Sequence, residues 1–233
     1  ILYVTFLHLS CFSSLLKKYF FVKHTTLCSF LNTLSGFVDR DSDGLADMGK
    51  DLQDRARAAM FSLGTTYPEL SGYYPQPKGL LFPAFLSVQN LSGIYSPFTI
   101  EANYNSAMVS YNLPFTICHE LSHLRGFMQE EEANFIGFLA CVNADDTAFN
   151  YSGYLLGWIY ATNELYEADY DTFVEIYNRL SDNVKADLSA NSSFWKRYDS
   201  KVAEVSGQIN DHYLKANGQS DGIKSYDRMV DLM

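Results

Sequence analysis

Apolar residues recur at every third or fourth position through most of the second half of the chain, and this spacing predicts helices. Pro114 suits the first turn of a helix, where its missing N–H is not needed, and Gly126 is expected to end that helix. Two more helices are expected in the first half, over 27–38 and 46–63. The helices expected in the second half are 113–126, 129–143, 151–166, 169–179, 182–190, 193–216 and 223–232.

The segment 64–112 has a different pattern, with frequent Gly, Pro, Tyr and Asn around short apolar runs. Such runs between turn residues predict strands, here over 79–88 and 94–104. The expected fold class is therefore α+β and mainly helical, with a small sheet ahead of the helix 113–126. No repeat or low-complexity linker divides the chain, so one domain over 27–233 is expected after an apolar segment, 1–26.

Composition excludes some classes of partner and site. Hydrophobic residues make up 47 % of the chain and charged residues 19 %, as in ordinary globular proteins. A formal net charge of −10 argues against nucleic acid, because phosphate binding requires clustered Lys and Arg. The four cysteines form no CxxC pair, so neither a zinc knuckle nor a disulfide framework is expected.

The N-terminal residues 1–16 are largely apolar and are followed by Lys17 and Lys18. This run is shorter than the roughly 20 residues that a membrane-spanning helix needs. It could be the end of a membrane anchor, the core of a signal sequence, an amphipathic helix or a helix packed on the domain. The sequence leaves these four interpretations open.

The stretch HELSH, residues 119–123, carries the clearest chemical pattern. On a helix His119 and His123 lie on one face, one turn apart, so both imidazoles can point at one metal ion. Glu120 is rotated by about 100° from His119 and can reach a metal-bound water as a general base. HExxH therefore predicts a Zn²⁺ site in which the metal activates a water and Glu120 takes its proton.

Zinc chemistry of this kind requires a third protein ligand, and the following residues offer several. A third histidine is expected at 129 in the HExxHxxGxxH pattern, but this chain has Gln129 there. On the next helix Glu130 shares a face with the small stripe Ala133, Asn134, Gly137 and Cys141, which lets another helix approach closely. Glu130 is therefore the predicted third ligand, and Asn134 is predicted to hydrogen-bond a ligand from the second shell.

The two neighbouring acids have an ordinary alternative role. Glu131 and Glu132 share faces with the bulky residues Phe135, Phe138 and Leu139. A solvated acidic first turn also favours the helix dipole. Glu131 and Glu132 are therefore expected to stabilise the first turn of the helix and not to bind the metal.

Three further features have candidate roles in such a site. Tyr226 is the first choice for a group that stabilises the oxyanion, with His212, Tyr213 and Arg228 as alternatives. The segment 96–105 is the candidate strand that guides an extended substrate. The loop 39–47, DRDSDGLAD, resembles a calcium loop, but Lys50 occupies the position of the bidentate acid, and an Asp-rich turn is the alternative.

Several motifs together resemble a bacterial family, domain of unknown function 3810. They are HELSHLRGF, EEEANFIGFLAC, GYYPQPK, SPFTIEANYN, LPFTICHE, YSGYLLG and NDHYLKANGQSDGIKSYDRMVDL. The resemblance covers roughly 27–233 and implies a zincin-like, gluzincin-type metallopeptidase fold. It also implies zinc ligands at His119, His123 and Glu130, a base at Glu120, and anchoring to a membrane by segments ahead of the domain.

The sequence thus predicts a zinc-dependent peptidase that acts on a peptide or protein substrate. The implied anchor places the protein at a membrane, with the peptidase domain on the extracytoplasmic side. One alternative is a non-catalytic, metal-containing surface domain for binding or sensing. A second alternative is an amidase that acts on cell-wall peptides, which would share every residue named above.

Overall fold

The structure is a computed structural model that describes residues 24–233. The interpretations of the apolar run 1–16 concern residues outside this range. The helices and strands are a helical stretch over 24–35, α2 Leu52–Thr66, η1 Pro68–Leu70, β1 Lys78–Gly79, α3 Ala84–Ser87, β2 Gly93–Ser96, β3 Glu101–Tyr104, α4 Asn112–His123, α5 Glu130–Val142, α6 Thr147–Ala168, α7 Tyr170–Asn178, α8 Asp182–Lys196, α9 Lys201–Ala216 and η2 Gly222–Leu232. No helix within 24–233 has the length and apolar character needed to cross a membrane.

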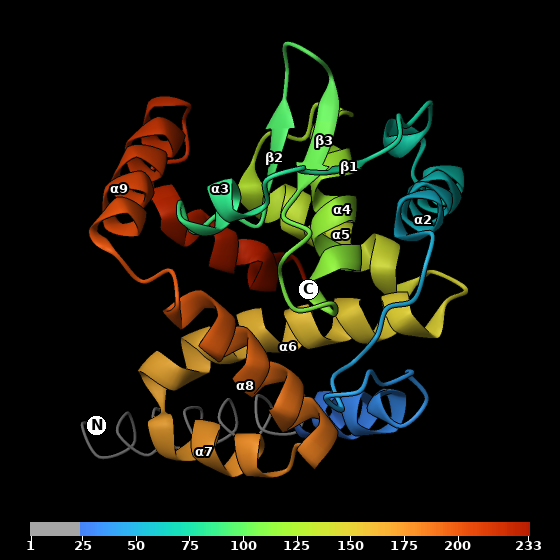
Figure 1. Ribbon diagram of the computed structural model, residues 1–233, viewed down its shortest axis with the longest axis vertical. Helices are drawn as coiled ribbons and strands as arrows, with labels where there is room; N and C mark the ends of the chain where they lie inside the picture. The colour runs from blue at the N-terminus through green and yellow to red at the C-terminus, as the bar shows by residue number, and fades with distance from the viewer. Residues whose placement is uncertain (1–23) are drawn as a thin grey trace, which may run out of the picture.

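Helix α6 separates two apolar cores. On one side it packs with α2, α4, α5 and the sheet around buried residues such as Met60, Phe115 and Phe149. On the other side the helical stretch 24–35, α7 and α8 pack around Tyr151 and Trp158 (Figure 1). The domain is therefore a mainly helical α+β structure, and its small sheet precedes α4, as the sequence predicts.

The sheet has three strands in the order β1-β3-β2. β1 pairs with β3 in parallel, and β2 pairs with β3 in antiparallel fashion, with Ile94 opposite Asn103. The segment predicted as one strand, 94–104, is therefore a hairpin of two strands. Its second half, β3, is the central strand of the sheet, and β2 is an edge strand. The prediction that 96–105 is an edge strand that guides the substrate is therefore wrong for β3.

Other boundaries also differ from the prediction; the helix predicted over 46–63, for example, begins at Leu52. The segment 79–88 is a strand only at its start and is helical over Ala84–Ser87, because its apolar side chains are not buried in a sheet. The helix predicted over 193–216 is divided, with α8 ending at Lys196 and α9 beginning at Lys201. Ser200 caps α9 by accepting a hydrogen bond from the backbone N–H of Ala203.

The Asp-rich loop 39–47 uses its carboxylates to hold its own backbone. Asp41 Oδ1 accepts hydrogen bonds from the N–H groups of Asp43 and Leu45, each at 2.9 Å. Asp47 Oδ1 accepts from the N–H of Gly49. These contacts are those of an Asp-rich turn, the alternative to the calcium loop.

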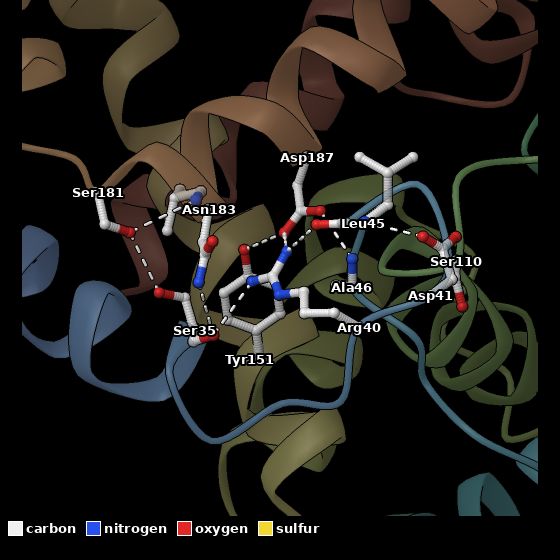
Figure 2. A network of polar contacts seen from close by, with 12 residues as sticks. Ser35, Arg40, Asp41, Leu45, Ala46, Ser110, Tyr151, Ser181, Asn183 and Asp187 are labelled. Atoms are coloured by element: carbon white, nitrogen blue, oxygen red, sulfur yellow. Dashed lines mark hydrogen bonds and ion pairs between the residues drawn. The ribbon is translucent and has the colours of Figure 1, made fainter.

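Figure 2 shows the polar network that ties this loop to the helical half of the molecule. Asp187 of α8 is fully buried and accepts hydrogen bonds from Arg40 at 2.8 Å, from the Tyr151 hydroxyl at 2.5 Å and from the N–H of Ala46 at 2.9 Å. One carboxylate of α8 therefore satisfies three donors from two other segments, the loop 39–47 and α6.

Replacing Asp187 with alanine is expected to lower the free energy of unfolding by about 3 kcal/mol, because it leaves Arg40 and the Tyr151 hydroxyl without their buried acceptor. Urea unfolding followed by circular dichroism measures this change. The control is Asp199→Ala, an exposed aspartate just after α8, which should change stability by less than about 0.5 kcal/mol. Equal stability of the two variants would contradict this account of the network.

Candidate metal centre

Helix α4 presents the HExxH residues inside the protein. Its residues from Asn112 to His123 are all buried, because α2, α5, α6 and the sheet surround it. The rings of His119 and His123 lie one helical turn apart with their centroids separated by 4.8 Å. Their Nε2 atoms are 3.2 Å from each other, so the two imidazoles converge on one point, as the spacing of the motif predicts.

The tautomer of His123 is set by a backbone carbonyl. After α4 the chain turns at Gly126, and the carbonyl oxygen of Phe127 lies 2.7 Å from His123 Nδ1. A carbonyl oxygen can only accept, so Nδ1 carries the proton and its N–H donates a hydrogen bond to the carbonyl oxygen of Phe127. The Nε2 atom of His123 therefore keeps its lone pair, which it directs toward His119.

Helix α5 brings the third side chain to the same point. Gly137 lets α5 cross α4 closely, since a Cβ atom there would lie 3.2 Å from the backbone nitrogen of His119. Glu130, in the first turn of α5, places Oε2 3.2 Å from His119 Nε2 and 3.9 Å from His123 Nε2. Glu131 and Glu132 take no part in this cluster, and Glu131 faces Arg228 at 3.9 Å.

The donor atoms fit a divalent metal ion. Within 24–233, the one group of His, Cys, Asp and Glu side chains that could hold a metal is His119, His123 and Glu130. Ligand atoms placed 2.0–2.1 Å from a tetrahedral zinc lie about 3.3 Å apart, close to the spacing of these atoms. Glu130 Oε2 is also buried, and although it lies 3.2 Å from His119 Nε2 it receives no well-formed hydrogen bond, so a cation would satisfy it.

The charges of this cluster depend on one another. Burial lowers the pKa of His119, but the polar contact with Glu130 and the charges of the nearby carboxylates outweigh it and raise that pKa overall. Burial and the charge of His119 lower the pKa of His123 to about 4. Burial raises the pKa of Glu130, but the two histidines outweigh it and lower that pKa. His123 and Glu130 are thus held in the deprotonated forms that bind metals.

Glu120 lies next to the His119, His123 and Glu130 cluster but is not one of its members. Its side chain is buried, Oε2 has no hydrogen-bond partner, and burial raises its pKa to about 8, with a further contribution from the charge of Glu130. The backbone of β2 contacts it, since a Cβ atom at Gly93 would lie 2.7 Å from Glu120 Cγ and Cδ. A buried carboxyl group whose pKa is shifted toward neutrality is suited to exchange a proton with a bound water.

The structure brings Asn134 and Tyr226 to the same site. The Asn134 amide donates a hydrogen bond to the carbonyl oxygen of Tyr226 at 3.0 Å. Asn134 also lies close enough to His119 to raise the pKa of that histidine, although His119 Nδ1 has no well-formed hydrogen bond. The Tyr226 hydroxyl contacts Glu130 and lowers the pKa of that carboxyl. The second-shell role of Asn134 and the catalytic role of Tyr226 stay predictions.

The alternatives to Tyr226 lie elsewhere. His212 and Tyr213 are exposed on α9, and Arg228 is exposed and bonded to Asp221 at 3.0 Å. Sequence reasoning missed the Phe127 carbonyl, because a backbone acceptor has no signature in the sequence. It also missed Gly93 and Tyr95, whose ring centroid is 6.0 Å from that of His123. The short run SGIYS that contains them carries no chemical motif.

Fold and site together define a mainly helical α+β protein with a buried His-His-Glu group that could bind a metal ion. The chain belongs to the family described as protein of unknown function (DUF3810), whose model matches residues 17–233, as the motifs indicate. The comparison with curated proteins and the comparison with solved structures each found no match.

Proposed function

We propose that this protein is a zinc-dependent peptidase of gluzincin type with a zincin-like fold. One observation carries the proposal: His119, His123 and Glu130 converge within 4.8 Å of one another, and the carboxyl group of Glu120, whose Oε2 has no hydrogen-bond partner, lies beside them. A purely structural metal site closes its coordination with four protein ligands, whereas three ligands leave a position for water or substrate. A buried acid next to that position has a use in hydrolysis and none in a structural site.

The roles of the chain's own residues follow from their positions. His119, His123 and Glu130 would hold zinc, which lowers the pKa of a water and polarises the substrate carbonyl when it is bound. Glu120 would accept the proton of the attacking water and deliver it to the leaving amine. Asn134 would orient His119, and Tyr226 would either stabilise the developing oxyanion or hold Glu130 in place.

Two other functions use the same cluster. A non-catalytic surface domain would need the metal for stability and would have no use for Glu120. An amidase that acts on cell-wall peptides would use every residue named here on a different substrate. We also propose attachment to a membrane through the N-terminal apolar segment, with the domain on the extracytoplasmic side, in keeping with the apolar run at 1–16.

The test is the effect of removing the metal. Protein purified without chelator is expected to contain about one zinc per chain and to cleave members of a library of fluorescence-quenched peptides. Dialysis against 1,10-phenanthroline should abolish cleavage, and one equivalent of zinc should restore it. Zinc bound without cleavage of any peptide would support the non-catalytic domain, and cleavage of peptidoglycan fragments alone would support the amidase.

A further inference from the structure

Residues 79–100, which lead from β1 through β2 to the tip of the hairpin, contain no charged residue and no histidine. Elsewhere the chain is acidic, with a formal net charge of −10 overall. An uncharged surface segment in an acidic protein needs a physical reason, because charged side chains normally keep exposed loops soluble.

This segment also exposes large apolar side chains. Leu81, Phe82 and Phe85 are 91, 79 and 64 % exposed before β2, and Phe98 and Ile100 are 96 and 60 % exposed after it. Ile100 has a φ of 55°, in the left-handed region that β-branched residues rarely adopt. Strained backbone and clustered exposed apolar residues both mark surfaces that bind something.

The apolar groups lie at the two ends of strand β2, which is the edge of the sheet next to the metal centre. Before β2, the N–H of Leu91 donates to the carbonyl of Leu86, which holds α3 near the start of the strand. After β2 the chain turns through Phe98 at the tip of the hairpin, which projects from the body of the molecule (Figure 1). Within 24–233, no further backbone segment pairs with the outer side of β2.

The face of β2 that carries Gly93 and Tyr95 covers the site. Gly93 lies against Glu120 and Tyr95 against His123, whereas Ile94 points to the other face and is half exposed. A strand added to the free edge of β2 would therefore pass beside the carboxylate of Glu120. Its side chains would meet the exposed apolar groups at both ends of β2.

We propose that β2 and the exposed residues Leu81, Phe82, Phe85, Phe98 and Ile100, here named the β2 apolar surface, bind an extended polypeptide through its bulky apolar side chains. This inference rests on the proposed peptidase function and names the substrate class: unfolded or flexible polypeptide stretches rich in Leu, Phe and similar residues. The surface offers no partner for charged side chains, so acidic and basic stretches are selected against.

A polypeptide fits this surface better than the other possible occupants. The surface is continuous with the site, because β2 contributes both the free edge and the contact with Glu120. A lipid bilayer would use exposed apolar tips but would have no use for a strand edge beside a buried carboxylate. A second copy of the chain would cover the metal centre that the proposed function requires to be open.

The experiment measures peptide binding separately from cleavage. Zinc-loaded Glu120→Gln protein is titrated into a fluorescein-labelled nonapeptide of alternating Leu or Phe and Gln, and into a matched peptide with Ser at every Leu and Phe. Fluorescence anisotropy is expected to show at least about tenfold tighter binding of the apolar peptide. Phe98→Ser, and separately the double variant Phe82→Ser with Phe85→Ser, should each weaken that binding about tenfold.

The matched control is Phe37→Ser, because Phe37 is 75 % exposed and closely follows the helical stretch 24–35. Figure 1 shows this stretch in the half of the molecule away from the hairpin. It should leave peptide affinity unchanged. Equal affinity for the two peptides, or no effect of the Phe98 and Phe82/Phe85 variants, would overturn the proposal.

Two further measurements test the other occupants. Pelleting with phosphatidylcholine vesicles that depends on Phe98, without apolar-peptide binding, would overturn the proposal in favour of a bilayer. A dimer in sedimentation velocity that Phe98→Ser dissociates would overturn it in favour of a second copy. Selective binding of the apolar peptide by a protein whose wild type cleaves nothing would support the surface and contradict the peptidase.

Discussion

Replacing Glu120 with glutamine is expected to lower kcat for peptide hydrolysis by about 10²- to 10⁴-fold while leaving zinc content unchanged. Glutamine has the same shape but cannot accept a proton, and Glu120 is not among the three converging ligand atoms. The measurement is kcat and KM on the best quenched peptide, together with zinc per chain by mass spectrometry. KM should change little, because the Glu120→Gln substitution affects proton transfer and not the binding of substrate.

The control for this variant is Glu132→Gln, which makes the same chemical change at an exposed position of the acidic run on α5. It should retain the wild-type kcat and zinc content. Full hydrolysis by the Glu120 variant would show that the general base is another residue. Loss of zinc from that variant would show that Glu120 binds the metal, contrary to its position outside the cluster.

The grouping of His119, His123 and Glu130 was predictable because it depends on the periodicity of two helices. Residues four apart share a helical face, so HELSH alone places His119 and His123 together. The stripe of small residues on the next helix indicated which of three glutamates would face α4, and Gly137 does lie against the backbone of His119. Within an element, geometry follows from spacing, and both α4 and α5 form close to the predicted bounds.

The sheet was less predictable because strand order depends on pairing between segments. The pattern over 94–104 predicts an extended strand. It does not show that β1 pairs with the other edge of β3 and so makes β3 the central strand. The apolar run 79–88 resembles a buried strand, yet Leu81 and Phe82 are exposed. Leu86 of the same run is buried, so its apolar pattern does not correspond to a strand with one regularly buried face.

Long-range polar contacts were not predictable at all. Arg40 and Asp187 are separated by 147 positions, and neither belongs to a motif that would pair them. The contact between Tyr226 and Glu130 likewise depends on η2 packing against α5. The chemistry of a tyrosine hydroxyl suggests a role for Tyr226, but only the fold shows that it contacts Glu130, whereas His212 and Tyr213 are exposed.

Replacing Glu130 with alanine is expected to reduce zinc content from about one per chain to below about 0.1 after dialysis. Loss of an outer-shell partner typically weakens metal binding 10- to 100-fold. Loss of a direct ligand should weaken it more, so we expect zinc affinity to fall by at least about 100-fold. Two histidines on one helix would remain, without the negative charge that helps to hold a divalent cation between them. Peptide hydrolysis should be lost together with the metal.

The effect on the metal can be separated from an effect on folding. Zinc that binds only the native state raises the melting temperature, so added zinc should stabilise the wild type and leave Glu130→Ala unchanged. Circular dichroism checks that the variant keeps its helices. Glu131→Ala and Glu132→Ala, made in the same acidic run, should keep both the zinc and the stabilisation. Full zinc content in Glu130→Ala, with loss of zinc from Glu131→Ala or Glu132→Ala, would show that the neighbouring glutamate is the third ligand. It would also contradict the assignment of the Glu130 face of α5 as the face that meets α4.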